Sequence, residues 1–117
     1  MANLLIVDDE ENIRLLYKEV LEEDGHKAEI AKDGEEALAR IERGGIDLVI
    51  LDIRMPGIDG IEVLRRMHEK NKNLKVILNS AYAGYEEDVH SWFSDAYIIK
   101  SGDLTELRNK VKEILAA

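Results

Sequence analysis

The sequence contains no cysteine, and this absence removes several kinds of chemistry from consideration. Disulfides, zinc–thiolate centres and thiol nucleophiles all require cysteine. No apolar run approaches the roughly 20 residues that a membrane-spanning helix needs, and the first residues lack the pattern of a signal peptide. We therefore expect a cytoplasmic protein that does not enter a membrane.

Basic residues are in the minority: 16 Lys and Arg stand against 25 Asp and Glu, for a formal net charge of −9. Because the phosphate backbone of a nucleic acid binds to a basic face, we expect no direct nucleic-acid binding. The chain has 117 residues, 45% of them hydrophobic and 35% charged, which is typical of one globular domain. We expect residues 1–117 to form a single domain, with no output domain in this chain.

Apolar runs alternate with segments of helical period along the whole chain. The runs predict five strands, at Leu4–Val7, Lys27–Ala31, Leu48–Leu51, Lys75–Leu78 and Ala96–Ile99. The first and third are apolar throughout, as in central parallel strands covered on both faces. Helical spacing of apolar residues predicts buried helix faces in two segments, Ile13, Leu16, Tyr17, Val20 and Leu21, and Leu104, Leu107, Val111, Ile114 and Leu115.

The predicted helices have recognisable starts and ends. Three acidic caps precede a glutamate by three residues, in the pairs Asp33/Glu36, Asp59/Glu62 and Asp103/Glu106, while Gly25 and Gly44-Gly45 end helices. The segment Ala83–Ser94 is the weakest predicted helix. Five strands alternating with five helices predict an α/β fold, a parallel sheet with right-handed crossovers and helices on both faces.

The chemically unusual residues lie at the ends of four predicted strands: Asp8-Asp9, Asp52, Asn79-Ser80 and Lys100. Parallel α/β sheets bind ligands outside the carboxyl ends of their strands, so these side chains are expected to share one pocket. A carboxylate at the exit of a buried strand is costly unless it acts chemically, as a metal ligand, a nucleophile or both.

The residue types in this predicted pocket suit phosphoryl transfer. Carboxylates brought together repel one another unless a cation joins them, and oxygen ligands of this kind suit Mg²⁺. Lys100 offers a point charge to a phosphoryl oxygen, and the hydroxyl of Ser80 can donate to another. A carboxylate nucleophile such as Asp52 beside a metal and a lysine is what aspartyl-phosphate chemistry requires.

With these residues in place, the chain resembles the receiver domain of bacterial two-component response regulators. The acidic pair lies in Val7–Glu10, and Asp52–Gly60 matches the family pattern D-x-x-M-P-x-x-D-G. Ser80-Ala81, Tyr97 and Lys100 match the remaining positions, so the resemblance covers essentially the whole chain. It implies a CheY-like, doubly wound sandwich of five βα units with a five-stranded parallel sheet of order 2-1-3-4-5.

The resemblance also implies a role for each matching residue. Asp52 would accept a phosphoryl group from a sensor histidine kinase, and Ser80 and Lys100 would hold the phosphoryl oxygens. Tyr97 would turn inward as Ser80 moves, and Ala81 would stay small so that the phosphoryl group remains accessible. The domain would assist its own phosphorylation and dephosphorylation without being an enzyme for other substrates.

The resemblance implies a metal site and partners as well. Mg²⁺ or Mn²⁺ would be held by Asp9, Asp52 and the backbone carbonyl of Arg54, with Asp8 contributing through water. Phosphorylation would change the face of the fourth helix, fifth strand and fifth helix, which would control a downstream protein or an output domain. The protein would be a monomer or a phosphorylation-dependent dimer.

One position departs from the family pattern, since Ser101 follows Lys100 where the family usually has a proline in a cis bond. A cis bond before a residue other than proline costs about 2.5–4 kcal/mol, so we expect a trans bond here.

Some residues, and the function itself, allow a second interpretation. Asp8 and Asp9 could merely cap the helix that begins near Glu11, and Tyr97 could be simple strand packing. The three histidines are expected at the surface. A Mg²⁺-dependent phosphohydrolase is the rival enzyme, although Arg54 occupies the place of its second aspartate. The chain could also be a flavodoxin-like cofactor binder or a receiver that only docks.

Overall fold

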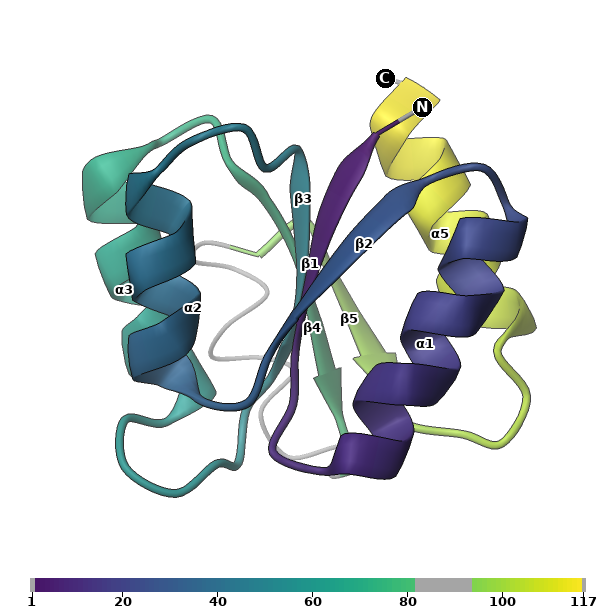
Figure 1. Cartoon of the computed structure of the whole chain (residues 1–117), viewed down its shortest axis with the longest axis horizontal. Helices are drawn as coiled ribbons and strands as arrows, with labels where there is room; N and C mark the ends of the chain where they lie inside the picture. The colour runs from purple at the N-terminus through teal and green to yellow at the C-terminus, as the bar shows by residue number, and fades with distance from the viewer. Residues whose placement is uncertain (1, 82–93, 117) are drawn as a thin grey trace.

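The structure is a computed structural model that describes residues 2–81 and 94–116. Its strands are β1 (Asn3–Val7), β2 (Lys27–Ala31), β3 (Leu48–Asp52), β4 (Lys75–Ser80) and β5 (Ala96–Ile99). Its helices are α1 (Glu11–Glu23), α2 (Gly34–Glu42), α3 (Gly60–Lys70) and α5 (Thr105–Ala116), labelled as in Figure 1. The helix predicted for Ala83–Ser94 falls, except for Ser94, outside the described residues.

The five strands form one parallel sheet in the order β2-β1-β3-β4-β5. Helices α2 and α3 cover one face of this sheet, and α1 and α5 cover the other (Figure 1). The predicted α/β sandwich and its sheet order are therefore confirmed. Within the two described ranges, no helix has the length and apolar character needed to cross a membrane.

Successive residues of the central strands supply two separate cores, because side chains in a strand point alternately to its two faces. Leu5, Val7, Val49 and Leu51 pack under α2 and α3. Leu4, Ile6, Leu48 and Ile50 pack under α1 and α5. All eight side chains are buried, which explains why the runs Leu4–Val7 and Leu48–Leu51 are apolar throughout.

Three strands are longer than the sequence predicts: β1 begins one residue earlier, at Asn3, and the extra residues of the other two belong to the candidate site. Strand β3 continues to Asp52, and β4 continues through Asn79 to Ser80. Asp52 and Asn79 are register partners in the β3–β4 ladder, so the ladder fixes their backbones instead of leaving them in loops. The prediction for Leu16 was wrong, because this side chain on α1 is 43% exposed.

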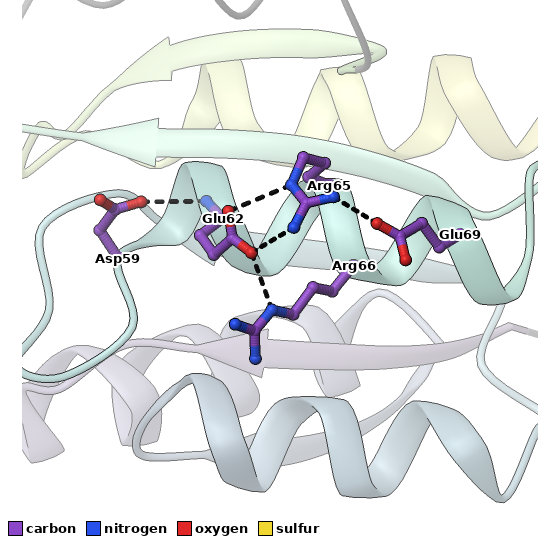
Figure 2. A network of polar contacts seen from close by, with 5 residues as sticks. All are labelled: Asp59, Glu62, Arg65, Arg66 and Glu69. Atoms are coloured by element: carbon purple, nitrogen blue, oxygen red, sulfur yellow. Dashed lines mark hydrogen bonds and ion pairs between the residues drawn. The ribbon is translucent and has the colours of Figure 1, made fainter.

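Helix α3 begins at the capping pair that the sequence predicts (Figure 2). The Asp59 carboxylate accepts a hydrogen bond of 3.0 Å from the Glu62 backbone N–H. The Glu62 carboxylate in turn accepts from Arg65 and Arg66, and Arg65 also pairs with Glu69. Hydrogen bonds from Arg65 and then Arg66 lower the pKa of Glu62 to about 2. This solvated network holds the first turns of α3 in place.

Two glycines allow α3 to approach its neighbours closely. A Cβ atom on Gly60 would lie 2.2 Å from the carbonyl oxygen of Asp52, and one on Gly34 would lie 2.5 Å from a methyl group of Val63. The Gly60 N–H also donates a 2.7 Å hydrogen bond to the Ile53 carbonyl. The start of α3 therefore packs directly against the backbone of Asp52 and fixes where β3 ends.

Candidate functional site

Three charged side chains from three strand ends lie together on the α1/α5 face of the sheet. Asp8 follows β1, Asp52 ends β3 and Lys100 follows β5. Each continues a row of alternating side chains that belongs to the core under α1 and α5, the rows ending in Ile6, Ile50 and Ile98. Because these rows share a face, the strands bring the three charges to one place.

The Lys100 ammonium bridges the two carboxylates. Its Nζ lies 2.8 Å from an Asp8 oxygen and 3.5 Å from an Asp52 oxygen. Both aspartates are buried, with 2% of Asp8 and 4% of Asp52 exposed. Two buried carboxylates share one cation, so the pocket holds more negative charge than Lys100 neutralises.

This excess charge appears in the pKa values. Burial raises the pKa of Asp52 to about 6; the charge of Asp8 adds to this effect, Lys100 opposes it, and Asp9 adds a smaller increase. Burial lowers the pKa of Lys100, but its hydrogen bond to Asp8 and the charges of Asp8 and Asp52 outweigh burial, so the net shift is upward. The lysine stays charged, while Asp52 is partly protonated near pH 6.

A second group of oxygen atoms lies at the rim of the pocket. The carboxylates of Asp8, Asp9 and Glu10 each place an oxygen within 4.8 Å of the others, with Asp8 buried and the other two exposed. Oxygen ligands of this kind are those that Mg²⁺ prefers. Glu10 belongs to this group although no ligand role was predicted for it, and Asp52 does not. The metal set of Asp8, Asp9, Asp52 and the Arg54 carbonyl stays a prediction.

The turn between β1 and α1 is held by hydrogen bonds to Asp8. One Asp8 carboxylate oxygen accepts from the Glu10 N–H at 2.9 Å, and the Asp8 carbonyl accepts from Arg14 Nη1 at 2.7 Å. The residue at the N-cap of α1 is Glu10, whose side chain makes no capping hydrogen bond. Capping thus accounts for one oxygen of Asp8 but offers no reason for the second carboxylate, Asp9.

Ser80 and Tyr97 lie on the other side of the sheet from Asp52. Ser80 is fully buried and alternates with Asn79, so its side chain begins in the row of Leu78. Tyr97 is the register partner of Leu78 and packs, half-buried, against the core under α2 and α3. The Lys100 N–H donates a 2.7 Å hydrogen bond to the Ser80 carbonyl, which joins the two strand ends. Their predicted roles, and that of the exposed Ala81, stay predictions.

The loop after Lys100 has the expected backbone. The bond from Lys100 to Ser101 is trans, since no cis peptide bond occurs among the described residues. The Ser101 hydroxyl accepts from the Asp103 N–H at 3.1 Å, and the Asp103 carboxylate accepts from the Thr105 N–H at 2.9 Å. Asp103 therefore caps the start of α5 through Thr105, whereas the sequence pattern predicts capping through Glu106.

Comparison with known proteins agrees with this geometry. The family model described as "response regulator receiver domain" matches residues 4–112. The chain belongs to the response regulator receiver domain family. This assignment, which the sequence motifs predict, makes the protein a signalling domain and favours that reading over a flavodoxin-like cofactor binder.

Relatives of this receiver include proteins of its own length and longer ones. It is 36% identical over 114 residues to the sporulation initiation phosphotransferase F of Bacillus subtilis, covering 96% of this chain and 92% of the relative. It is also 36% identical to the transcriptional regulatory protein ResD of the same organism, but covers 97% of this chain and only 48% of ResD. The receiver thus spans about half the length of such regulators.

A solved structure matches the receiver closely. The response regulator protein TrrA of Thermotoga maritima, in complex with Mg²⁺ and BeF, shares 49% identity at a TM-score of 0.93 and covers 97% of this chain and 99% of that one. A second structure contains TrrA with the histidine kinase ThkA, at 50% identity and a TM-score of 0.91, covering 98% of this chain and 99% of that one.

The receiver has two further polar residues in its pocket to which the sequence motifs assign no role. Asn79 Nδ2 donates a 2.7 Å hydrogen bond to the Tyr17 hydroxyl, across 62 residues of sequence. Burial raises the pKa of Tyr17, while its hydrogen bond with Asn79 and the charge of Lys100 lower it, and the charges of Asp8 and Asp52 raise it. The sequence signals only Asn79, as a polar residue at the end of an apolar run. Tyr17 gives no such signal, because its position fits ordinary helix packing.

Proposed function

We propose that this receiver is a phosphorylation-controlled switch that accepts a phosphoryl group on Asp52 from a sensor histidine kinase. The observation that carries the proposal is the buried Asp52 carboxylate at the end of β3, with the Lys100 ammonium 3.5 Å away and the oxygen cluster of Asp8, Asp9 and Glu10 beside it. A carboxylate, a cation and a cluster of oxygen ligands are the parts that aspartyl phosphorylation needs. The complex of TrrA with a kinase supports the choice of partner.

The proposed reaction moves one phosphoryl group. A carboxylate oxygen of Asp52 attacks the phosphorus of a phosphohistidine on the kinase, forming a phosphorus–oxygen bond as the phosphorus–nitrogen bond breaks. The released imidazole keeps the bonding electrons and takes a proton from solvent. Lys100 lies where it can draw charge from a phosphoryl oxygen, and the small side chain of Ala81 leaves that oxygen accessible. Asp52 must be ionised to attack, so its raised pKa favours reaction above about pH 6.

The oxygen cluster fits a divalent cation. Asp9, Asp52 and the Arg54 carbonyl, together with Asp8 through water, are the proposed ligands, and Glu10 is an additional candidate because its oxygen lies in the same cluster. Hard oxygen ligands and an excess of negative charge suit Mg²⁺, and Mn²⁺ accepts the same ligand types. When bound, the cation would neutralise charge on the phosphoryl oxygens and on the carboxylates. The TrrA complex with Mg²⁺ and BeF supports this choice.

The proposed output is a change of surface near β5 and α5. Ser80 would move toward a phosphoryl group on Asp52, and Tyr97 would turn inward. This movement would alter the face that the sequence predicts for the fourth helix, fifth strand and fifth helix, of which the structure describes β5 and α5. The hydrogen bond between the Lys100 N–H and the Ser80 carbonyl couples the ends of β4 and β5 and supports this route. The target is a downstream protein or an output domain, and the receiver acts as a single domain, as a monomer or a phosphorylation-dependent dimer.

The proposal is tested with a small phosphodonor. Acetyl phosphate with Mg²⁺ should add one phosphoryl group to the wild type, releasing acetate, and intact-mass spectrometry should detect the added mass. Asp52→Asn should abolish this labelling. Asp59→Asn is the matched control, because asparagine caps a helix as well as aspartate does, and it should be labelled normally. Full labelling of Asp52→Asn would move the acceptor to another carboxylate and overturn the proposal.

A further inference from the structure

The hydrogen bond between Tyr17 and Asn79 is unusual for its surroundings. Both side chains are almost fully buried, with 3% of Tyr17 and 2% of Asn79 exposed, where the charged pocket meets the apolar core under α1 and α5. A buried polar atom without a partner costs free energy, and replacing both members of a buried pair by apolar groups of the same shape is often nearly neutral or stabilising. Packing alone therefore gives no reason for the pair.

The Asn79 amide can accept a hydrogen bond that it does not receive from the described residues. Its Nδ2 is used by Tyr17, whereas its buried Oδ1 has no hydrogen-bond partner among the residues that the structure describes. Whichever way the amide is turned, only one of its two polar atoms meets the tyrosine oxygen. The pair thus brings an unused polar atom into the interior, next to the register partner Asp52.

The path of Lys100 passes over Asn79. Lys100 follows β5, whereas the two carboxylates that its ammonium meets lie at the ends of β3 (Asp52) and β1 (Asp8). Since β4 lies between β5 and β3 in the sheet, the Lys100 side chain must cross the end of β4. Asn79 is the last β4 residue on that face, since its amide meets Tyr17 from α1. The ammonium carries three N–H donors, and it pairs with two carboxylates among residues 2–81 and 94–116.

We propose that Asn79, held by the Tyr17 hydroxyl, is a positioning residue that supports Lys100 from below and offers its amide oxygen as a third acceptor. In this arrangement Tyr17 and Asn79 limit where the ammonium can lie relative to Asp52. The inference rests on the proposed function, because positioning of Lys100 matters for phosphoryl transfer to Asp52. The proposal adds two polar side chains to the pocket, Tyr17 from α1 and Asn79 from β4.

The test compares the wild type with Tyr17→Phe, Asn79→Leu and the double variant. Each protein is incubated with acetyl phosphate and saturating Mg²⁺, and the maximal labelling rate and the urea unfolding midpoint are measured. Loss of one hydrogen bond to the positioning residue should slow labelling about fivefold. The double variant should recover the unfolding midpoint, because no polar group is left unpaired, but should stay slow. Wild-type labelling by the double variant would overturn the proposal and leave a purely structural pair.

A second comparison asks whether Asn79 acts through Lys100. Asn79→Leu should slow the wild type but add no further loss in the Lys100→Met background. Equal fold-losses in both backgrounds would contradict the positioning role. Ile77→Val, one pleat below on the same strand face, is the control, since it removes a methylene group and no polar atom, and it should be labelled at the wild-type rate. An unlabelled wild type would instead refute the proposed function, so the two failures are distinguishable.

Discussion

The Lys100 ammonium lies closer to Asp8, at 2.8 Å, than to the proposed acceptor Asp52, at 3.5 Å. In this arrangement the lysine is first a counter-ion for the buried Asp8 and only second a partner for Asp52. A phosphoryl group on Asp52 would therefore compete with Asp8 for the same ammonium. Lys100 thus has a structural role beside the chemical role that we propose for it, and experiment can separate the two.

Lys100→Met should destabilise the protein strongly at neutral pH. The substitution leaves two buried carboxylates without their cation, and breaking a buried ion pair on one side costs about 3–5 kcal/mol. The loss should shrink near pH 4, where Asp52, whose pKa is raised to about 6, binds a proton instead. Urea unfolding at both pH values measures the difference. Lys72→Met, at an exposed lysine, is the matched control and should change little. An equal loss at both pH values would contradict the counter-ion role.

Asp52→Asn should stabilise the protein at pH 7 in the absence of divalent cations. The pKa of Asp52 is raised from 3.8 to about 6, so the native state binds more protons than the unfolded state between these values. The contribution of Asp52 is therefore fully present below pH 3.8 and is lost as the pH rises through 6. Removing the ionisable group should recover about 1–3 kcal/mol at pH 7.

The pH dependence separates this effect from better packing. Unfolding free energies of the wild type and Asp52→Asn should converge below about pH 4, where both side chains are neutral. A constant difference from pH 4 to pH 7 would mean that the pKa of Asp52 is not raised in the native state.

Mg²⁺ should stabilise the wild type, because a ligand that binds only the native state adds free energy by mass action. At a concentration about tenfold above Kd the gain is about 1.4 kcal/mol, visible as a higher melting temperature. Asp9→Ala should remove the gain at little cost to the fold, since Asp9 is exposed. Glu19→Ala, another exposed acid, should keep it. A melting temperature that does not respond to millimolar Mg²⁺ at fixed ionic strength would count against the metal site.

Gly60→Ala should destabilise the protein by about 1–3 kcal/mol or more, as overpacking of a close backbone contact does. The new Cβ would meet the Asp52 carbonyl oxygen at 2.2 Å, and that atom belongs to the backbone at the end of β3. Gly102→Ala is the control, because nothing lies within 4 Å of its added Cβ. Chemical denaturation of both variants checks the prediction, and similar midpoints would show that α3 can shift without cost.

Local patterns in the sequence were sufficient to identify the strands and helices that the structure describes. Apolar runs located the five described strands. Two of the three predicted acidic caps act through the expected glutamate: Asp33 caps α2 through Glu36, and Asp59 caps α3 through Glu62. Such patterns work because strand and helix periods depend on neighbours in sequence. The same patterns predicted that Asp8, Asp52 and Lys100 lie together at the carboxyl ends of parallel strands, and ion pairs join them there.

The remaining features depend on partners that are distant in the sequence. The ends of β3 and β4 lie beyond the predicted runs because Asp52 and Asn79 pair with each other across the ladder. Leu16 fits the helical pattern yet is exposed, since the orientation of α1 on the sheet decides which side chains are covered. The sequence by itself determined the order of elements and the chemical types at the strand ends. Only tertiary packing decided that Lys100 meets Asp8 more closely than Asp52 and that Tyr17 meets Asn79, because contacts between remote segments follow from how the helices and strands pack together.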